Sequence, residues 1–378
     1  MSKLPNTGTS IFAVMTAIAA EYKAINLSQG FPNFNPPSKL IDLVYHFMKS
    51  GENQYAPMTG TYQVRNSIAN KIKKYSGANY DVNEEITLTA GGTQALFTAI
   101  TSFVGKGDEV ILFEPAYDSY LPSVILNGGI PVPVQLKGND FHIDWNEVND
   151  KISPKTKMII INSPHNPSGS VLNEKDISAL KYIAEKHNII ILSDEVYEHI
   201  IFDGREHHSV TKYPELAAKS IVVYSFGKTY HTTGWKMGYV LAPKNLMSEF
   251  RKVHQFNVFT VNTPVQLAFA EMMKDEEHFL SLSNFYQEKR DYFLRIIKNS
   301  EFTFEPSSGT YFQLLDYSTI SDENDSDFSV RLVKEFGVAV IPLTPFYSML
   351  NDRKLIRICF AKTNDVLEQA AERLMKVK

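Results

Sequence analysis

The fold of this chain is decided by one stretch, Ser225-Phe226-Gly227-Lys228-Thr229-Tyr230-His231-Thr232-Thr233-Gly234-Trp235-Lys236. The apolar run before it, Ile221–Tyr224, has the β-branched and aromatic composition of a buried strand. Lys228 follows within one turn of the strand end and lies between Gly227 and Gly234. Glycines are used where the backbone takes unusual angles or approaches a ligand closely. The pattern therefore predicts a buried strand that ends in a lysine-bearing loop.

Two interpretations of Lys228 are open from this stretch. Most lysines are solvated surface side chains. Here Phe226, Tyr230 and Trp235 are close in sequence, and an aromatic environment would desolvate the amine and make it more nucleophilic. The residue is therefore either a surface lysine or one that forms a Schiff base.

Length and composition are typical of a soluble globular protein. The 378 residues are 43% hydrophobic and 21% charged, which is enough chain for two domains. The formal net charge of -4 and the lack of a Lys/Arg block give no reason to expect nucleic acid as a partner. Cys359 is the only cysteine, so no disulfide within the chain is possible; we expect no metal and a reducing cytoplasm. No apolar stretch approaches the ~20 residues of a membrane span, so we expect no membrane partner.

The N-terminal segment Ile11–Ala20 is uncharged and mostly apolar, as in a targeting signal. However, Lys3 is the only basic side chain before it, and Thr9-Ser10 could cap a helix. The positions that would share one face of that helix are Phe12, Met15, Ala19 and Tyr22. We expect a docking helix here.

The middle of the chain alternates apolar runs with amphipathic segments. The expected strands are Ile86–Thr89, Val110–Phe113, Met158–Ile161, Ile189–Leu192 and Ile221–Tyr224, and the expected helices include 37–50, 64–76, one from Gly91 and 174–187. This alternation predicts an α/β fold with a mostly parallel central sheet flanked by helices. After Pro243 come helices, and the chain ends in a mixed unit with strands at 312–315, 338–341 and 355–360 and a helix at 366–375.

Ligands of such folds gather at the carboxyl ends of the strands. Polar residues follow three of these ends, at 162–169, 193–197 and 225–236. Asp194 comes directly after an apolar run, where a carboxylate needs a partner; a structural salt bridge and a functional role are both open. Gly92 and Thr93 lie in a Gly-rich turn that opens a helix, which offers backbone N–H groups to a phosphate.

Two further side chains have open roles. Tyr117 lies near a strand end and could stack on a flat ligand or belong to the core. Arg357 stands between Ile356 and Ile358, where it either pairs with a protein carboxylate or binds an anionic ligand. Together with Lys228 and Asp194, these residues supply the parts that hold pyridoxal 5'-phosphate (PLP): a lysine, an acid, a phosphate cradle and an aromatic ring.

The sequence resembles the fold type I, class I aminotransferases, in particular the bacterial methionine aminotransferases and the related kynurenine and glutamine-phenylpyruvate transaminases. The resemblance covers essentially the whole chain. The matching segments, in the family's order, are Asn26–Pro32, Asn53–Gly60, Ser163–Gly169, Ser193–His199 and Ser225–Lys236.

The resemblance implies a role for each matching residue. Lys228 would form the Schiff base and then move a proton at the substrate. Asp194 would keep the pyridine nitrogen protonated, Tyr197 and Asn166 would hydrogen-bond the ring hydroxyl, and Tyr117 would stack on the ring. The implied phosphate ligands are Gly92, Thr93, Ser225 and Lys236, with Tyr55 from a second subunit. The implied substrate ligands are Gly30, Asn166 and Arg357, with Phe259 from the partner.

One departure concerns Lys236, where many class I members have arginine. Lysine keeps the charge but loses the bidentate geometry, so phosphate binding should persist with altered affinity.

The resemblance also implies the PLP fold type I architecture. Residues 45–275 would form a large PLP-binding domain, and 1–44 together with 276–378 a small α+β domain built from both chain ends. The active site would lie between the subunits of a homodimer.

The implied activity is amino-group transfer to a 2-oxo acid with ping-pong kinetics. Arg357 accounts for one carboxylate, and the residues expected near the substrate side chain are Ile11, Phe12, Phe31, Tyr117 and Phe259. We therefore expect methionine and aromatic or neutral amino acids to be preferred over aspartate and glutamate. Two alternatives remain: a PLP-dependent carbon–sulfur β-lyase of the cysteine-conjugate type, and a non-catalytic PLP-binding regulatory protein.

Overall fold

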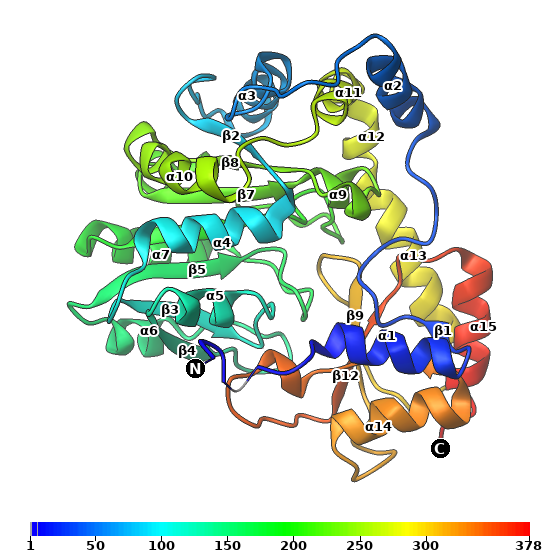
Figure 1. The fold of residues 1–378 in the computed structure, drawn as a ribbon. Coiled ribbons are helices and arrows are strands. Elements are labelled where there is room, and N and C mark those ends of the chain that lie inside the picture. Colours follow the sequence, from blue (N-terminus) through cyan, green and yellow to red (C-terminus); the bar gives the residue numbers. More distant parts are fainter. Residues whose placement is uncertain (1, 6) are drawn as a thin grey trace.

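The computed structural model describes residues 2–5 and 7–378 and has an α/β architecture (Figure 1). Its large sheet contains, in spatial order, β2 (Ile86–Thr89), β8 (Gly238–Leu241), β7 (Ser220–Ser225), β6 (Ile190–Asp194), β5 (Thr156–Asn162), β3 (Glu109–Glu114) and β4 (Ile130–Gln135). The pairs are parallel except that β8 runs antiparallel to both β2 and β7. The predicted α/β fold with a mostly parallel sheet is confirmed.

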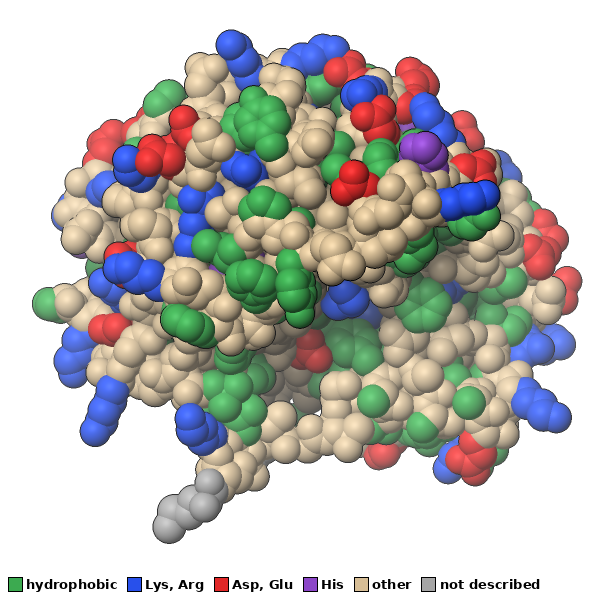
Figure 2. All heavy atoms as spheres, turned by 45° about the horizontal axis from the view of Figure 1, so that its top comes forward, with side chains coloured by type: hydrophobic (Ala, Val, Ile, Leu, Met, Phe, Trp, Pro, Cys, Tyr) green, Lys and Arg blue, Asp and Glu red, His purple; other side chains and the backbone are tan. Residues whose placement is uncertain are grey.

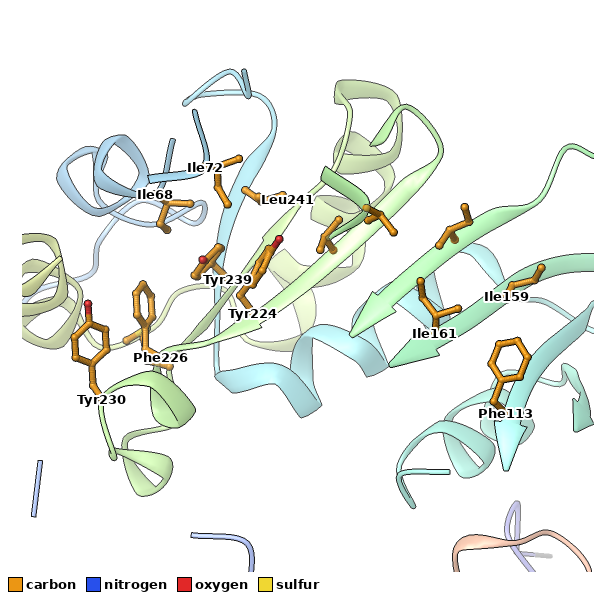
Figure 3. Close-up of a cluster of buried hydrophobic side chains, with 14 of the residues drawn as sticks. Ile68, Ile72, Phe113, Ile159, Ile161, Tyr224, Phe226, Tyr230, Tyr239 and Leu241 are labelled. Carbon is orange, nitrogen blue, oxygen red and sulfur yellow. The ribbon is translucent and has the colours of Figure 1, made fainter. Parts of the chain in front are cut away.

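Helices cover both faces of this sheet because its strands are apolar on both sides. In β3, Ile111 and Phe113 face one core cluster, whereas Val110 and Leu112 face the other. The first cluster includes side chains of α3 (Tyr62–Ser76), α6 (Trp145–Lys151), α7 (Glu174–Lys186), α8 (Pro214–Ala217) and α11 (Thr263–Met272), and Figure 3 shows part of it. The second includes side chains of α4 (Gly91–Phe103), α5 (Tyr120–Leu126) and α10 (Lys244–Asn257).

The N-terminal segment that contains α1 (Ile11–Glu21) and β1 (Ile25–Asn26) lies against the C-terminal part of the chain, beside the large sheet (Figure 1). A parallel pair joins β1 to β10 (Val338–Ala339), and an antiparallel sheet has the order β11 (Ile341–Pro342), β12 (Leu355–Cys359), β9 (Phe312–Asp316). The helices here are α12 (Glu276–Leu280), α13 (Leu282–Ile296), α14 (Asp325–Arg331) and α15 (Asn364–Leu374). The single strand predicted at 338–341 is wrong, because this segment is split between two sheets. The domain boundaries at 44/45 and 275/276 stay a prediction.

The N-terminal helices agree only partly with the sequence pattern. Helix α1 (Ile11–Glu21) begins at the predicted cap, where Ser10 accepts a hydrogen bond from the backbone of Ala13, and it buries Met15 and Ala19. In α2 (Ser38–Lys49), Leu40 is buried, but the other apolar positions remain partly or fully in water. The helix predicted at 37–50 is confirmed, and most of its apolar face is not covered by its own chain. None of the helices among the described residues is long and apolar enough to cross a membrane.

Candidate active site

The polar carboxyl ends of β5, β6 and β7 meet at one edge of the sheet. Asn162 lies opposite Asp194 in the β5–β6 register, and the next strand ends at Ser225. A cavity of about 240 Å³ opens here, and the surface is hollowed between the two parts of the molecule (Figure 2). The predicted site residues that line it are Gly30, Gly92, Thr93, Tyr117, Asn166, Asp194, Tyr197, Ser225, Lys228, Lys236 and Arg357. The structure therefore brings most of the predicted site together.

Lys228 lies in the short helix α9 (Phe226–Thr229), directly after β7. Its Nζ donates hydrogen bonds to the hydroxyl of Tyr311 at 2.7 Å and to the carbonyl of Gly30 at 3.2 Å. It also lies 5.4 Å from the ring centroid of Tyr197. Burial is the main cause that lowers the pKa of Lys228 from 10.5 to about 8. The amine is thus desolvated, as the sequence predicts.

The aromatic residues predicted to surround Lys228 lie elsewhere. Phe226 stacks on Phe269 of α11 with ring centroids 4.4 Å apart, and Tyr230 lies 5.3 Å from the same ring. Both rings belong to the core cluster of Figure 3. Trp235 also packs near Phe269, at 6.1 Å. The prediction named the wrong neighbours because residues before and after a lysine in a tight turn point away from it.

Of the two roles offered for the glycines around Lys228, an unusual backbone angle is wrong, whereas Gly227 does line the cavity. Neither Gly227 nor Gly234 has a positive φ; His231 and Lys236 do, at 57° and 53°. Gly227 is needed for space, since a Cβ there would lie 3.0 Å from the Cα of Thr233. A Cβ on Gly234 would meet nothing within 4 Å. Close packing, not backbone angle, explains Gly227.

Asp194 is buried at the end of β6. Its carboxylate accepts hydrogen bonds from the hydroxyl of Tyr120 at 2.7 Å and from the backbone N–H of Val196 at 3.3 Å. Burial raises its pKa from 3.8 to about 6, and the bond from Tyr120 opposes this shift. Within the described part of the chain no cation lies within 4 Å of it. The interpretation of Asp194 as half of a structural salt bridge is therefore wrong.

Arg357 is only 1% exposed, in the middle of β12. Its guanidinium donates to Asn166 Oδ1 at 2.7 Å and to the carbonyl of Ser28 at 3.1 Å, and it lies 3.9 Å from the ring centroid of Phe312. Its Nε has no hydrogen-bond partner, and residues 2–5 and 7–378 offer it no carboxylate within 4 Å. Burial lowers its pKa to about 10. The alternative of a protein ion pair is wrong, and the geometry fits an anionic ligand.

The start of α4, which was predicted to hold a phosphate, lines the cavity with Gly91, Gly92 and Thr93. The first N–H groups of a helix have no partner within it, and Ala90 at the N-cap makes no side-chain hydrogen bond. The side chain of Lys236 lies against this turn, with Nζ 3.6 Å from the position of a Cβ on Gly91. The hydroxyls of Thr93 and Tyr117 are 3.1 Å apart, which fixes the tyrosine beside the cradle.

Two predicted residues, Tyr55 and Phe259, do not line the cavity. They are 85% and 46% exposed, and their rings meet edge to face at 5.6 Å. Both were assigned to the partner's site, and they form one exposed aromatic pair.

Sequence reasoning missed two residues of the site, Tyr120 and Tyr311, and gave Asn162, within the polar segment 162–169, no role of its own. Tyr120 holds Asp194, Tyr311 contacts Lys228, and Asn162 donates to the backbone carbonyl of Asp194 at 2.9 Å. Tyr120 follows Tyr117 by three residues, and a turn in which the N–H of Tyr120 donates to the carbonyl of Tyr117 at 3.1 Å leads into α5. Nothing in the sequence signals Tyr311.

This fold and this edge of the sheet define a fold type I enzyme, the class in which a lysine after a strand binds pyridoxal phosphate. The family is equally clear. The chain belongs to the aminotransferases of class I and II, whose family model matches residues 22–374.

Individual relatives agree with this assignment. The chain is 48% identical over 377 residues to a methionine aminotransferase of Escherichia coli, covering 100% of this chain and 98% of that protein. It is 33% identical to a kynurenine–oxoglutarate transaminase of Dictyostelium discoideum, covering 98% of this chain and 94% of the other. A solved structure of an E. coli protein with a methionine aminotransferase function superimposes with a TM-score of 0.97 at 47% identity, covering 100% and 99%.

Proposed function

We propose that this protein is a PLP-dependent aminotransferase that prefers methionine and large neutral or aromatic amino acids. One observation carries the proposal. Among the described residues, the charged side chains that line the cavity are Asp194, Lys228, Lys236 and Arg357. In the proposed complex the cofactor and the substrate α-carboxylate would pair with all four of these side chains. No cation would then be left to pair with a carboxylate in the substrate side chain.

The residues present fit pyridoxal phosphate. The uncapped start of α4 and the cation of Lys236 suit a phosphate, and a Cβ on Gly92 would lie 3.0 Å from Val196 and narrow the cradle. When bound, the cofactor supplies an aldehyde and a ring that accepts electrons. The phosphate would lie against Gly92, Thr93, Ser225 and Lys236.

The same edge of the sheet would orient the ring. Asp194, fixed by Tyr120, would hold a proton on the pyridine nitrogen. Tyr197 and Asn166 would hydrogen-bond the ring hydroxyl, and Tyr117 would cover one face of the ring.

Lys228 would attach the cofactor and then move a proton at the substrate α-carbon. With a pKa of about 8, about a tenth of the free amine is neutral at pH 7, far more than for an ordinary lysine. A base works best when its pKa lies near the working pH.

Substrate choice follows from the walls of the cavity. Arg357, Asn166 and the backbone of Gly30 would hold the α-carboxylate, while Phe12, Tyr117 and Phe312 supply apolar surface. Such walls gain roughly 25 cal/mol per Å² of apolar surface buried, and thioethers pack well on aromatic edges. The other predicted wall residues, Ile11 and Phe31, do not line the cavity. Two relatives named for methionine and for kynurenine support this choice.

A homodimer with shared sites is part of the proposal. Tyr55 and Phe259 form an exposed pair on one chain, and α2 presents Ile41, Tyr45 and Met48 at 45–64% exposure. A second copy would cover these side chains and receive Tyr55 at its phosphate. The buried lone Cys359 supports the predicted reducing cytoplasm.

The deciding experiment compares kcat/KM for methionine and aspartate with one shared 2-oxo acid. We expect kcat/KM to be at least about tenfold higher for methionine, because the side-chain carboxylate of aspartate would be buried in the cavity without a cation. An equal or higher value for aspartate would overturn the substrate proposal. Release of thiol and ammonia from cysteine conjugates, without amino transfer, would instead indicate the β-lyase.

A further inference from the structure

Tyr311 lies outside every predicted role and yet contacts the amine of Lys228. The phenol oxygen of Tyr311, the carbonyl of Gly30 and the Nζ of Lys228 form a closed triangle. The amine donates to the phenol at 2.7 Å and to the carbonyl at 3.2 Å, and the phenol donates to the same carbonyl at 2.5 Å.

The phenol of Tyr311 is held rigidly. The residue is fully buried, and its backbone carbonyl accepts from the N–H of Phe360 at 3.0 Å. Its ring meets Tyr197 edge to face at 5.2 Å and lies 5.7 Å from Tyr286. A side chain packed on both sides in this way has little freedom to move its hydroxyl.

Gly30 lies against the ring of Phe312, which a larger residue would have to displace. A Cβ there would lie 2.7 Å from the ring of Phe312, the first residue of β9. The N-terminal loop and β9 therefore approach closely enough for one carbonyl to serve both Tyr311 and Lys228.

The direction of each hydrogen bond follows from the chemistry. Burial raises the pKa of Tyr311 well above its usual value, so it is a neutral phenol with a single proton. That proton goes to Gly30, which leaves the phenol oxygen to accept from Lys228. A neutral amine that donates one hydrogen to each acceptor keeps its lone pair unshared.

We propose that Tyr311 is a positioning residue: its hydroxyl and the Gly30 carbonyl hold the free amine of Lys228 with its lone pair available for reaction. The triangle holds the amine in the protein alone. The second part of the proposal rests on the proposed function: the same two contacts would hold the amine of Lys228 again after a substrate amine has taken its place at the cofactor.

The test uses Tyr311→Phe, which keeps the ring and removes only the hydroxyl. Tyr286→Phe is the matched control, because Tyr286 is buried in the same cluster and its hydroxyl has no partner among the described residues. Both purified full-length variants are first compared with wild type by circular dichroism. The cofactor is then removed, trace acetic anhydride labels the lysines across a pH series, and mass spectrometry quantifies the Lys228 peptide.

We expect the labelling midpoint of Lys228 to fall by about 1 pH unit in Tyr311→Phe, because the ammonium form loses a hydrogen-bond acceptor. Tyr286→Phe should label like wild type. An unchanged midpoint in Tyr311→Phe, or the same shift in both variants, overturns the proposal. This measurement does not depend on catalysis, so it stands even if the wild type transfers no amino group.

With cofactor bound, Tyr311→Phe should lower kcat for methionine by about tenfold, the effect of one hydrogen bond, and leave the affinity for a carboxylate analogue without an amine unchanged. Wild-type kcat in Tyr311→Phe overturns the second part of the proposal alone. A wild type that is inactive on every amino acid overturns the proposed function instead.

Discussion

The hydroxyl of Tyr120 donates a hydrogen bond to the carboxylate of Asp194 over 2.7 Å, and both side chains are buried. This bond joins the start of α5 to the end of β6. It fixes the orientation of the acid and opposes the rise in its pKa that burial causes. The geometry of the acid therefore depends on a residue that does not touch the proposed cofactor's ring nitrogen.

Replacing Tyr120 with phenylalanine should lower kcat for methionine by about tenfold, the effect of one hydrogen bond to a charged group. KM should change much less, because Asp194 would act on the ring and not on the substrate carboxylate. Steady-state kinetics of wild type and variant decide this. Equal changes in kcat and KM would indicate a general loss of structure.

Asp194 should make the cofactor-free protein less stable as pH rises. Folding raises its pKa from 3.8 to about 6, so the unfolded chain releases the proton at lower pH than the folded one. Stability is therefore lost between about pH 4 and about pH 6. Asp194→Asn cannot titrate, and its melting temperature should exceed that of wild type at pH 7 and approach it at pH 4. A difference in melting temperature between Asp194→Asn and wild type that does not change with pH would contradict this prediction.

Lys228→Ala should retain the cofactor through its phosphate and ring contacts but lose roughly 10²–10⁴-fold in turnover, the typical range for a lost acid–base group. In wild type, borohydride reduction and peptide mapping should find the pyridoxyl label on Lys228. Label on a different lysine would falsify the assignment.

Arg357→Lys should reduce kcat/KM by roughly 10- to 150-fold, the range for a lost hydrogen bond to a charged group. Lysine keeps the charge but cannot bind a carboxylate with two parallel N–H groups. The reduction should be similar for methionine and phenylalanine, because both carry the same α-carboxylate. A loss confined to one of them would place Arg357 near the substrate side chain.

Mixed dimers test the shared site. Tyr55→Ala and Lys228→Ala subunits should each be weakly active alone, and mixing them should restore some activity, since one site of a hybrid would have both residues intact. Confirmed subunit exchange without recovery would argue against a contribution of Tyr55 to the partner's site.

The sequence predicts five strands of the large sheet because they are short, apolar and bounded by polar turns, whereas β4 and β8 were not predicted. The ends of β5, β6 and β7 were placed to within about two residues, and register then brings Asn162 next to Asp194. The local sequence pattern is sufficient to place a strand when the burial of each residue is decided by that strand alone.

The contacts around Lys228 could not be predicted in the same way. Its partner Tyr311 lies 83 residues further along the chain, and Gly30 lies 198 residues before it. Neighbours in sequence such as Phe226 point into the core instead. Helix α2 was predicted correctly, but its pattern shows only an apolar face and not whether the same chain covers that face.

The pairing of β1 with β10 has a consequence for synthesis on the ribosome. The loop that carries Gly30 into the site directly follows β1, whose only strand partner among the described residues lies about 310 residues later. At about 5–20 residues per second, that partner emerges roughly 15–60 s after β1. The last strand of the large sheet, β8, emerges about 100 residues before β10, so this sheet can be complete while the N-terminal segment still remains without its partner. The carbonyl that holds Lys228 can therefore reach its position only after nearly the whole protein has been made.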